Sequence, residues 1–211
     1  MFGDGALTFR EFVMREPLPL ATIQDAVLGF LRGRDDAALF GAQAVNAYVD
    51  EPRMTQDVDL LSPRAQELAE EIKNFLHDKF HIAVRVRKVK EGTGYRIYQV
   101  RKPKNRHLVD VRMIRTLPPT KRVDEVLVLT PVELIAGKVM AMTQRKGKPK
   151  AGSDWRDLAK LLLMFPEMKT ESGTVRQRLE AAIADGANSA VLKTWQDLVQ
   201  QEILPEDDDD F

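Results

Sequence analysis

Two aspartates, Asp57 and Asp59, stand one residue apart at the start of an apolar stretch, and they constrain the fold of this chain most. The apolar neighbours predict a short strand over residues 57–61. Side chains at i and i+2 of a strand lie on the same face, about 6.5 to 7 Å apart. Two carboxylates that close repel each other unless a cation lies between them. The pattern therefore predicts a metal site, and hard oxygen ligands suit Mg²⁺.

A glycine precedes this pair at the start of a short predicted helix, residues 42–48. Gly41 permits a sharp turn and a close backbone approach, and the N–H groups that begin a helix attract anions. We expect Gly41, Ala42 and Gln43 to face a phosphate. Chain connectivity places that phosphate beside the carboxylate strand.

The order of these motifs resembles a known enzyme family. Gly41-Ala42-Gln43-Ala44 is followed by Arg53-x-Thr55-x-Asp57-Val58-Asp59 and later by Lys138, Arg145 and Asp157. Over roughly residues 20–170 this resembles the nucleotidyltransferase fold of the DNA polymerase beta type, and more narrowly its AbiEii/AbiGii toxin branch. One position departs from the family pattern. Ala42 stands where a glycine or serine is usual, although its N–H can still donate and Gln43 can replace the serine hydroxyl.

The resemblance implies a Mg²⁺-dependent enzyme that transfers an NMP from an NTP to a hydroxyl and releases pyrophosphate. It implies RNA as the acceptor, in particular the 3′ end of a tRNA, and a toxin with a cognate antitoxin protein as partner. The implied catalytic and metal-binding residues are Asp57, Asp59 and Asp110. The implied nucleotide-binding residues are Gly41, Ala42, Gln43, Arg53, Thr55, Lys138, Arg145 and Asp157.

Asp110 lies on an alternating stretch, residues 107–114. Alternation places Asp110 on one face with Leu108 and Arg112, and a strand beside the Asp57 strand would complete a three-carboxylate cluster. The three histidines, His77, His81 and His107, lack the spacing of metal ligands, so no catalytic part is expected of them.

Several implied nucleotide contacts have simpler readings. Lys138 lies in an apolar helix, from which a lysine can reach solvent as well as a triphosphate, and Arg145 lies on the same helix face. Asp157 could favour a helix dipole or belong to the site. Arg53 could reach a phosphate or pair with Glu51.

The formal net charge is zero, but residues 85–122 carry thirteen Lys or Arg against Glu91 and Asp110 only. This segment is a candidate surface for a phosphate-rich partner, or simply a solvated hairpin face. Tyr95 and Tyr98 fall on opposite faces of their strand, so only one can lie on the basic face. The acidic tail, residues 205–211, is predicted to be a disordered solubilising end or to mask the basic face.

The predicted fold class is α+β: a nucleotidyltransferase-like mixed sheet of four or five strands, backed by helices and followed by a C-terminal helical region. Residues 1–129 are the expected catalytic core and 130–204 the helical region. The expected strands are 57–61, 81–86, 95–100 and 107–114. The expected helices are 23–31 capped by Thr22, 42–48, 64–79, 134–142 after a capping box from Thr130 to Glu133, 153–163, 174–184 and 189–203.

The chain has no cysteine, which excludes disulfides and thiol-ligated zinc. It has no apolar run long enough to cross a bilayer and no signal-peptide pattern, so we expect a cytoplasmic protein. Two other functions fit the same residues. One is transfer to a small molecule or a protein, and the other is a nucleotide- or partner-binding module without turnover.

Overall fold

The computed structural model describes residues 18–89 and 92–205. Within these ranges one mixed seven-stranded sheet has the order β3-β4-β5-β2-β1-β7-β6. The pair β2 and β5 is parallel, as is β1 and β7, and the other neighbours are antiparallel. The strands are β1 (Ala38–Phe40), β2 (Val58–Ser62), β3 (Val84–Val89), β4 (Gly94–Gln99), β5 (Arg106–Met113), β6 (Thr120–Val123) and β7 (Val126–Leu129).

The α+β class is confirmed, but the expected four or five strands are too few. The difference arises at β1, β6 and β7, which have three or four residues each. Segments this short carry too little alternation to stand out, and tertiary pairing decides their structure.

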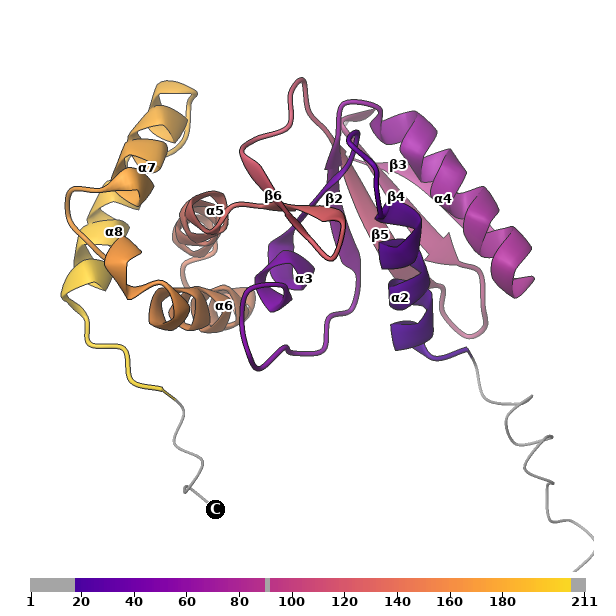
Figure 1. Ribbon diagram of the computed structural model, residues 1–211, viewed down its shortest axis with the longest axis horizontal. Coiled ribbons are helices and arrows are strands. Elements are labelled where there is room, and N and C mark those ends of the chain that lie inside the picture. The colour runs from indigo at the N-terminus through magenta and orange to yellow at the C-terminus, as the bar shows by residue number, and fades with distance from the viewer. Residues whose placement is uncertain (1–17, 90–91, 206–211) are drawn as a thin grey trace, which may run out of the picture.

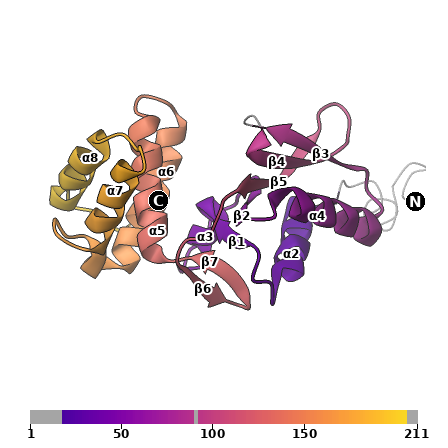
Figure 2. The ribbon, with the colours of Figure 1, turned by 90° about the horizontal axis from the view of Figure 1, so that it is seen from above.

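Helices cover the sheet on both sides (Figures 1 and 2). α2 (Leu20–Leu31) and α4 (Ala65–Phe80) lie side by side on one side, whereas α3 (Gly41–Asn46) and the C-terminal helices lie on the other. The C-terminal helices are α5 (Pro131–Gln144), α6 (Lys150–Met164), α7 (Thr174–Ala184) and α8 (Ala190–Gln200), with a 3-10 turn η2 (Pro166–Met168).

The core lies between the sheet and these helices. α2 buries Ile23, Val27 and Leu31 at helical spacing, and α4 contributes a similar stripe that packs over β3, β4 and β5. α2 begins after Pro19, so Thr22 is not its cap. Pro19 occupies the N-cap position, and its fixed φ suits an extended entry to the helix.

The capping box expected at Thr130 does not form. α5 does begin with Pro131, but Thr130 makes no side-chain capping bond, and Glu133 instead accepts two bonds from Arg178 of α7, at 2.7 and 2.8 Å. An ion pair with a guanidinium is stronger than a bond to a neutral N–H. Glu133 therefore joins two helices rather than capping one.

The C-terminal helices pack against the sheet through α3 and the loop after it. The hydroxyl of Tyr48 donates to the carbonyl of Leu129 at 3.0 Å, and its ring meets Phe165 edge-on at 5.9 Å. α7 spans the predicted residues 174–184, α8 is shorter than predicted, and α6 begins at Lys150, so the basic loop before it is shorter as well.

None of the helices in the described ranges is both long and apolar enough to span a membrane. The acidic residues 206–211 lie outside those ranges, so the expectation for the tail is untested.

Candidate active site

The two strands that carry the predicted carboxylates are neighbours. β2 pairs in parallel with β5, with Asp59 opposite Asp110 and Val58 opposite Val109. Neighbouring strands lie about 4.8 Å apart and opposite residues share a face, so Asp59 and Asp110 lie side by side. Asp57 directly precedes β2 rather than beginning it, contrary to the predicted strand over 57–61.

Gly41 lies against Asp59. Its φ is +72°, and a Cβ built there would lie 2.3 Å from Oδ2 of Asp59, so both the conformation and the space require glycine. The turn at Gly41 therefore leaves the space that the carboxylate of Asp59 occupies. Burial, followed by the negative charge of Asp57, raises the pKa of Asp59 to about 6.

A β-bulge changes the face of one histidine. Ile97 lies opposite Val109, but the next residue of β4, Tyr98, lies opposite His107, so Leu108 is an extra residue in β5. Such a bulge breaks the alternation of the strand. Leu108, which strict alternation assigned to the carboxylate face, is buried in the core, and His107 lies on the carboxylate face instead.

His107 lies between two carboxylates. Its Nδ1 is 3.0 Å from Oδ2 of Asp57, and its Nε2 is 3.0 Å from Oδ1 of Asp110. Asp57, His107 and Asp110 present ligand atoms within 4.8 Å of one another, a group that could hold a divalent metal. The sequence spacing of the three histidines did not anticipate this placement of His107 beside two carboxylates.

Arg96 of β4 holds Asp110 from the other side. Its Nε and Nη2 donate to the two carboxylate oxygens at 2.7 and 3.1 Å. Burial acts to raise the pKa of Asp110, but the bonds from His107 and Arg96 outweigh it and hold that pKa well below its usual range. Burial also acts to lower the pKa of His107, but Asp110 and Asp57 outweigh it and raise it to about 9. His107 is therefore an imidazolium at neutral pH.

A second charged cluster joins the loop before β2 to α5 and α6. Asp157 accepts bonds from Arg53 at 2.6 and 3.0 Å and from Lys138 at 2.5 Å. Asp154 accepts from Lys138 at 3.4 Å and from Arg145 at 2.5 Å. Three of the predicted cations thus share two buried carboxylates.

Asp154 was not among the predicted site residues, although one signal could have revealed it. It lies three residues before Asp157 in the same helix, and such residues share a face. Arg53 pairs with Asp157 and not with Glu51, which pairs with Lys160 at 3.1 Å. The alternative expected for Arg53 is therefore wrong.

Two further predicted residues, Thr55 and Gln43, bind each other. The buried hydroxyl of Thr55 donates to Oε1 of Gln43 at 2.9 Å and accepts from Gln24 of α2 at 3.0 Å. The side-chain amide of Asn46 makes two hydrogen bonds with the backbone of Arg53. Its Nδ2 donates to the Arg53 carbonyl at 2.8 Å, and its Oδ1 accepts from the Arg53 N–H at 3.1 Å. These bonds fix the loop that carries Arg53 and Asp57.

A family model for the nucleotidyl transferase AbiEii toxin of type IV toxin-antitoxin systems matches residues 26–211. The chain belongs to the AbiEii nucleotidyl transferase toxin family. The predicted family is confirmed, and the predicted enzyme class, a nucleotidyltransferase, is that of the family. A comparison with curated proteins finds no match.

Solved structures agree on the fold of this AbiEii family member. The polyadenylate synthase of Megavirus has a TM-score of 0.58 at 14% identity, over 72% of this chain and 33% of that one. The chain therefore spans about a third of the synthase. A putative nucleotidyltransferase from H. pylori (TM-score 0.53, 14% identity, 92% and 93% covered) and JHP933 from Helicobacter pylori (0.52, 13%, 92% and 90%) match over most of both chains. At these identities the likeness shows the nucleotidyltransferase fold alone.

An open hollow of about 780 Å³ in this AbiEii-family chain lies away from the carboxylates, along α6 and residues 202–205. Its lining includes none of Asp57, Asp59 and Asp110.

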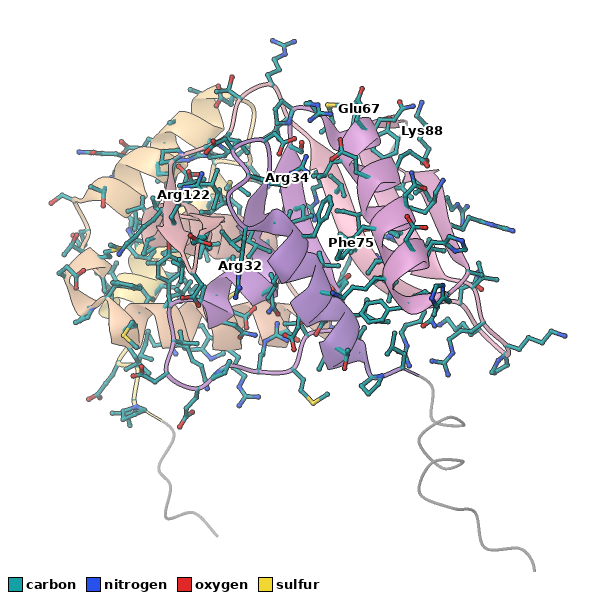
Figure 3. The ribbon with its side chains drawn as sticks, turned by 45° about the vertical axis from the view of Figure 1, so that its right-hand side comes forward. Arg32, Arg34, Glu67, Phe75, Lys88 and Arg122 are labelled. Carbon is teal, nitrogen blue, oxygen red and sulfur yellow. The ribbon has the colours of Figure 1, made fainter. Side chains whose placement is uncertain are left out.

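The basic segment, residues 85–122, does not form one patch. Figure 3 shows Lys88 of β3 and Arg122 of β6 on opposite sides of the molecule, as expected for the two edge strands. Arg122 pairs with Asp35 and donates to the carbonyl of Glu125. Among the described residues of this segment, those on β3, β4 and β5 belong to the strands on the Asp110 side of the sheet, whereas β6 is the opposite edge.

Proposed function

We propose that this chain transfers an NMP from an NTP to a hydroxyl of RNA, with Mg²⁺ held by Asp57, Asp59 and Asp110. The observation that supports this best is the register of β2 and β5, which sets Asp59 opposite Asp110 with Asp57 two residues away. Three carboxylates gathered in one place, two on the sheet and one directly before β2, repel each other. A divalent cation bound among the three carboxylates would offset this repulsion.

The side chains fit such a cation. Carboxylate oxygens are the ligands that Mg²⁺ prefers, and the cluster already accommodates positive charge, since His107 lies 3.0 Å from both Asp57 and Asp110. The carboxylate of Asp59 makes no hydrogen bond or ion pair with any residue in the described ranges. When bound, Mg²⁺ would offset the charge of the triphosphate and of the departing pyrophosphate.

In the proposed reaction the acceptor oxygen bonds to the α-phosphorus, the α–β anhydride bond breaks, pyrophosphate leaves with the bonding electrons, and the hydroxyl proton passes to water. Asp110 is a weak base while Arg96 and His107 hold its pKa low. We therefore assign Asp110 to cation binding and not to proton transfer.

The second cluster supplies positive charge for the triphosphate. Among the described residues, the three cations Arg53, Lys138 and Arg145 make ion pairs with the two carboxylates of Asp154 and Asp157. Side-chain exposure is 27% for Arg53 and 33% for Arg145 but 10% for Lys138. We assign the triphosphate contact to the two arginines and the positioning of both aspartates to Lys138.

Nucleotide labelling of RNA tests this proposal. The chain is incubated with each α-labelled NTP, Mg²⁺ and total RNA, beside Asp57→Ala/Asp59→Ala and a control, Asp78→Ala/Asp197→Ala, which removes two exposed carboxylates from α4 and α8. We expect labelled RNA from the wild type and the control only. Equal labelling by the Asp57→Ala/Asp59→Ala variant would refute the proposed site.

Labelling of a protein or small molecule instead of RNA would move the acceptor to another class. Tight NTP binding without any labelled product would indicate a binding module. The family's type IV toxin-antitoxin system supports a cognate antitoxin as partner, which co-purification with the product of a neighbouring gene would test.

A further inference from the structure

Two rows of side chains cross the sheet from its edge to the carboxylates. In the first row, Arg87 of β3 lies opposite Arg96 of β4, which lies opposite Asp110 of β5, which lies opposite Asp59 of β2. Directly opposite residues share a face. This row therefore joins an edge arginine to the carboxylate cluster on one surface.

The second row runs beside the first. Arg85 of β3 lies opposite Tyr98, and Tyr98 lies opposite His107, with ring centroids 5.3 Å apart. His107 then contacts Asp57 at 3.0 Å. Each row thus begins with an arginine on the edge strand and ends at an aspartate of the site.

The opposite face of the same strands is closed. Tyr95 is buried and donates to Gln66 of α4 at 3.0 Å, while Lys88 lies over the Tyr95 ring at 5.9 Å. α4 packs over β3, β4 and β5 on that side (Figure 2). The expectation that only one of the two tyrosines lies on the basic face is confirmed, and that tyrosine is Tyr98.

Arg85 and Arg87 are exposed and make no ion pair or hydrogen bond with any side chain among residues 18–89 and 92–205. Charged residues on an edge strand can serve merely to prevent aggregation. That role does not require an aromatic ring between the arginine and the active site, nor two rows that end at its carboxylates.

We propose that Arg85, Arg87 and Tyr98 form a binding surface for a single strand of RNA, which leads its 3′ hydroxyl to the carboxylate cluster. Such sites combine cations that follow the backbone with an aromatic ring on which a base stacks. β3 lies two strands from Asp110 and three from Asp59, or about 10 to 14 Å. At about 3.4 Å per stacked nucleotide, this corresponds to about three to four nucleotides. The assignment of a direction to the strand rests on the proposed function.

Binding of RNA without nucleotide or Mg²⁺ tests the surface alone. A labelled single strand of about ten nucleotides is titrated into the wild type, Arg85→Gln/Arg87→Gln, and the control Lys88→Gln/Lys121→Gln. The control removes the same charge from exposed positions off this face. Circular dichroism verifies that all three are folded.

We expect the arginine variant to bind at least about tenfold more weakly at low salt. The slope of log K against log salt should become less negative by about 1.4, or about 0.7 for each lost phosphate contact. The control should match the wild type. Equal losses in both variants, or polyglutamate competing as well as RNA does, would overturn the proposal.

Transfer assays separate this surface from the proposed reaction. If RNA is labelled but the arginine variant binds and labels it normally, the surface is wrong and the reaction stands. If the arginine variant loses RNA binding but no protein labels RNA, the surface stands and the reaction is wrong. If both the surface and the reaction are right, the arginine variant should label long RNA less than the wild type does. It should label a dinucleotide acceptor as well as the wild type does, because a dinucleotide is too short to reach Arg87.

Discussion

Gly41 shows how one residue supports the carboxylate cluster. We expect Gly41→Ala to abolish transfer and to lower the free energy of unfolding by about 1–3 kcal/mol, because the new Cβ would overlap Asp59 at a positive φ. Activity assays and denaturant titration measure both effects. Gly29→Ala is the control: it adds a methyl group to α2 with nothing within 4 Å and should stabilise by about 0.5–1 kcal/mol. Full activity in Gly41→Ala would contradict the prediction.

Asp59 should make stability depend on pH in a defined direction. Its pKa is raised from 3.8 to about 6 in the folded protein, so between these values the folded state binds more protons and stability falls as pH rises. Asp59→Asn removes that cost. Its gain in unfolding free energy should be near zero below about pH 4 and reach at most about 3 kcal/mol above about pH 6. Denaturant titrations without Mg²⁺ test this, and an equal effect at both pH values would refute it.

At the scale of elements, the buried ion pairs hold α5, α6 and the loop before β2 together. Asp157→Ala leaves Arg53 and Lys138 without their shared carboxylate and should cost about 3–5 kcal/mol of unfolding free energy. Thermal and chemical denaturation measure it. Glu180→Ala, which breaks an exposed pair within α7, should cost less than about 1 kcal/mol. If Asp157→Ala lowered the free energy of unfolding by no more than Glu180→Ala does, the prediction would be contradicted.

The bulge in β5 places His107 beside the carboxylates proposed to bind Mg²⁺. His107→Ala removes the imidazolium from between Asp57 and Asp110, so the protein without metal should melt at a lower temperature and Mg²⁺ should bind more tightly and raise that temperature further. Calorimetric titration and melting curves with and without Mg²⁺ test this. Weaker Mg²⁺ binding in the variant would instead identify His107 as a ligand.

These elements show what the sequence could predict. The alternation of β5 and the Asp57–Asp59 spacing are local patterns. They do not give the register between β2 and β5, so the choice of Asp110 as the third carboxylate depended on the family resemblance. The bulge at Leu108 depends on pairing with β4, so local alternation assigned Leu108 to the wrong face. The pair between Arg53 and Asp157 joins residues 104 positions apart, and no local pattern predicts which partner a surface arginine finds.

For the whole molecule, the attachment of the C-terminal helices to the sheet can be followed with intrinsic probes. Trp155 and Trp195 lie on α6 and α8, and amide exchange across β2 reports the sheet. In the wild type both regions should open with the same free energy. In Arg53→Ala the loop loses its ion pair with Asp157. The opening free energy from amide exchange in β2 should then be lower than the unfolding free energy from tryptophan fluorescence. Arg176→Ala, an exposed change within α7, should leave them equal, and coincidence in both variants would contradict the prediction.

The bond between Arg53 and Asp157 also concerns synthesis. Chains emerge from the ribosome with the N-terminal region first, so Asp57, Asp59 and Asp110 have all emerged before α6 exists. Until residue 157 has emerged, the loop before β2 lacks the carboxylate that holds Arg53. A fragment released before α6 would therefore carry all three site carboxylates and both arginines, but it would lack Asp154 and Asp157, which hold those arginines in place.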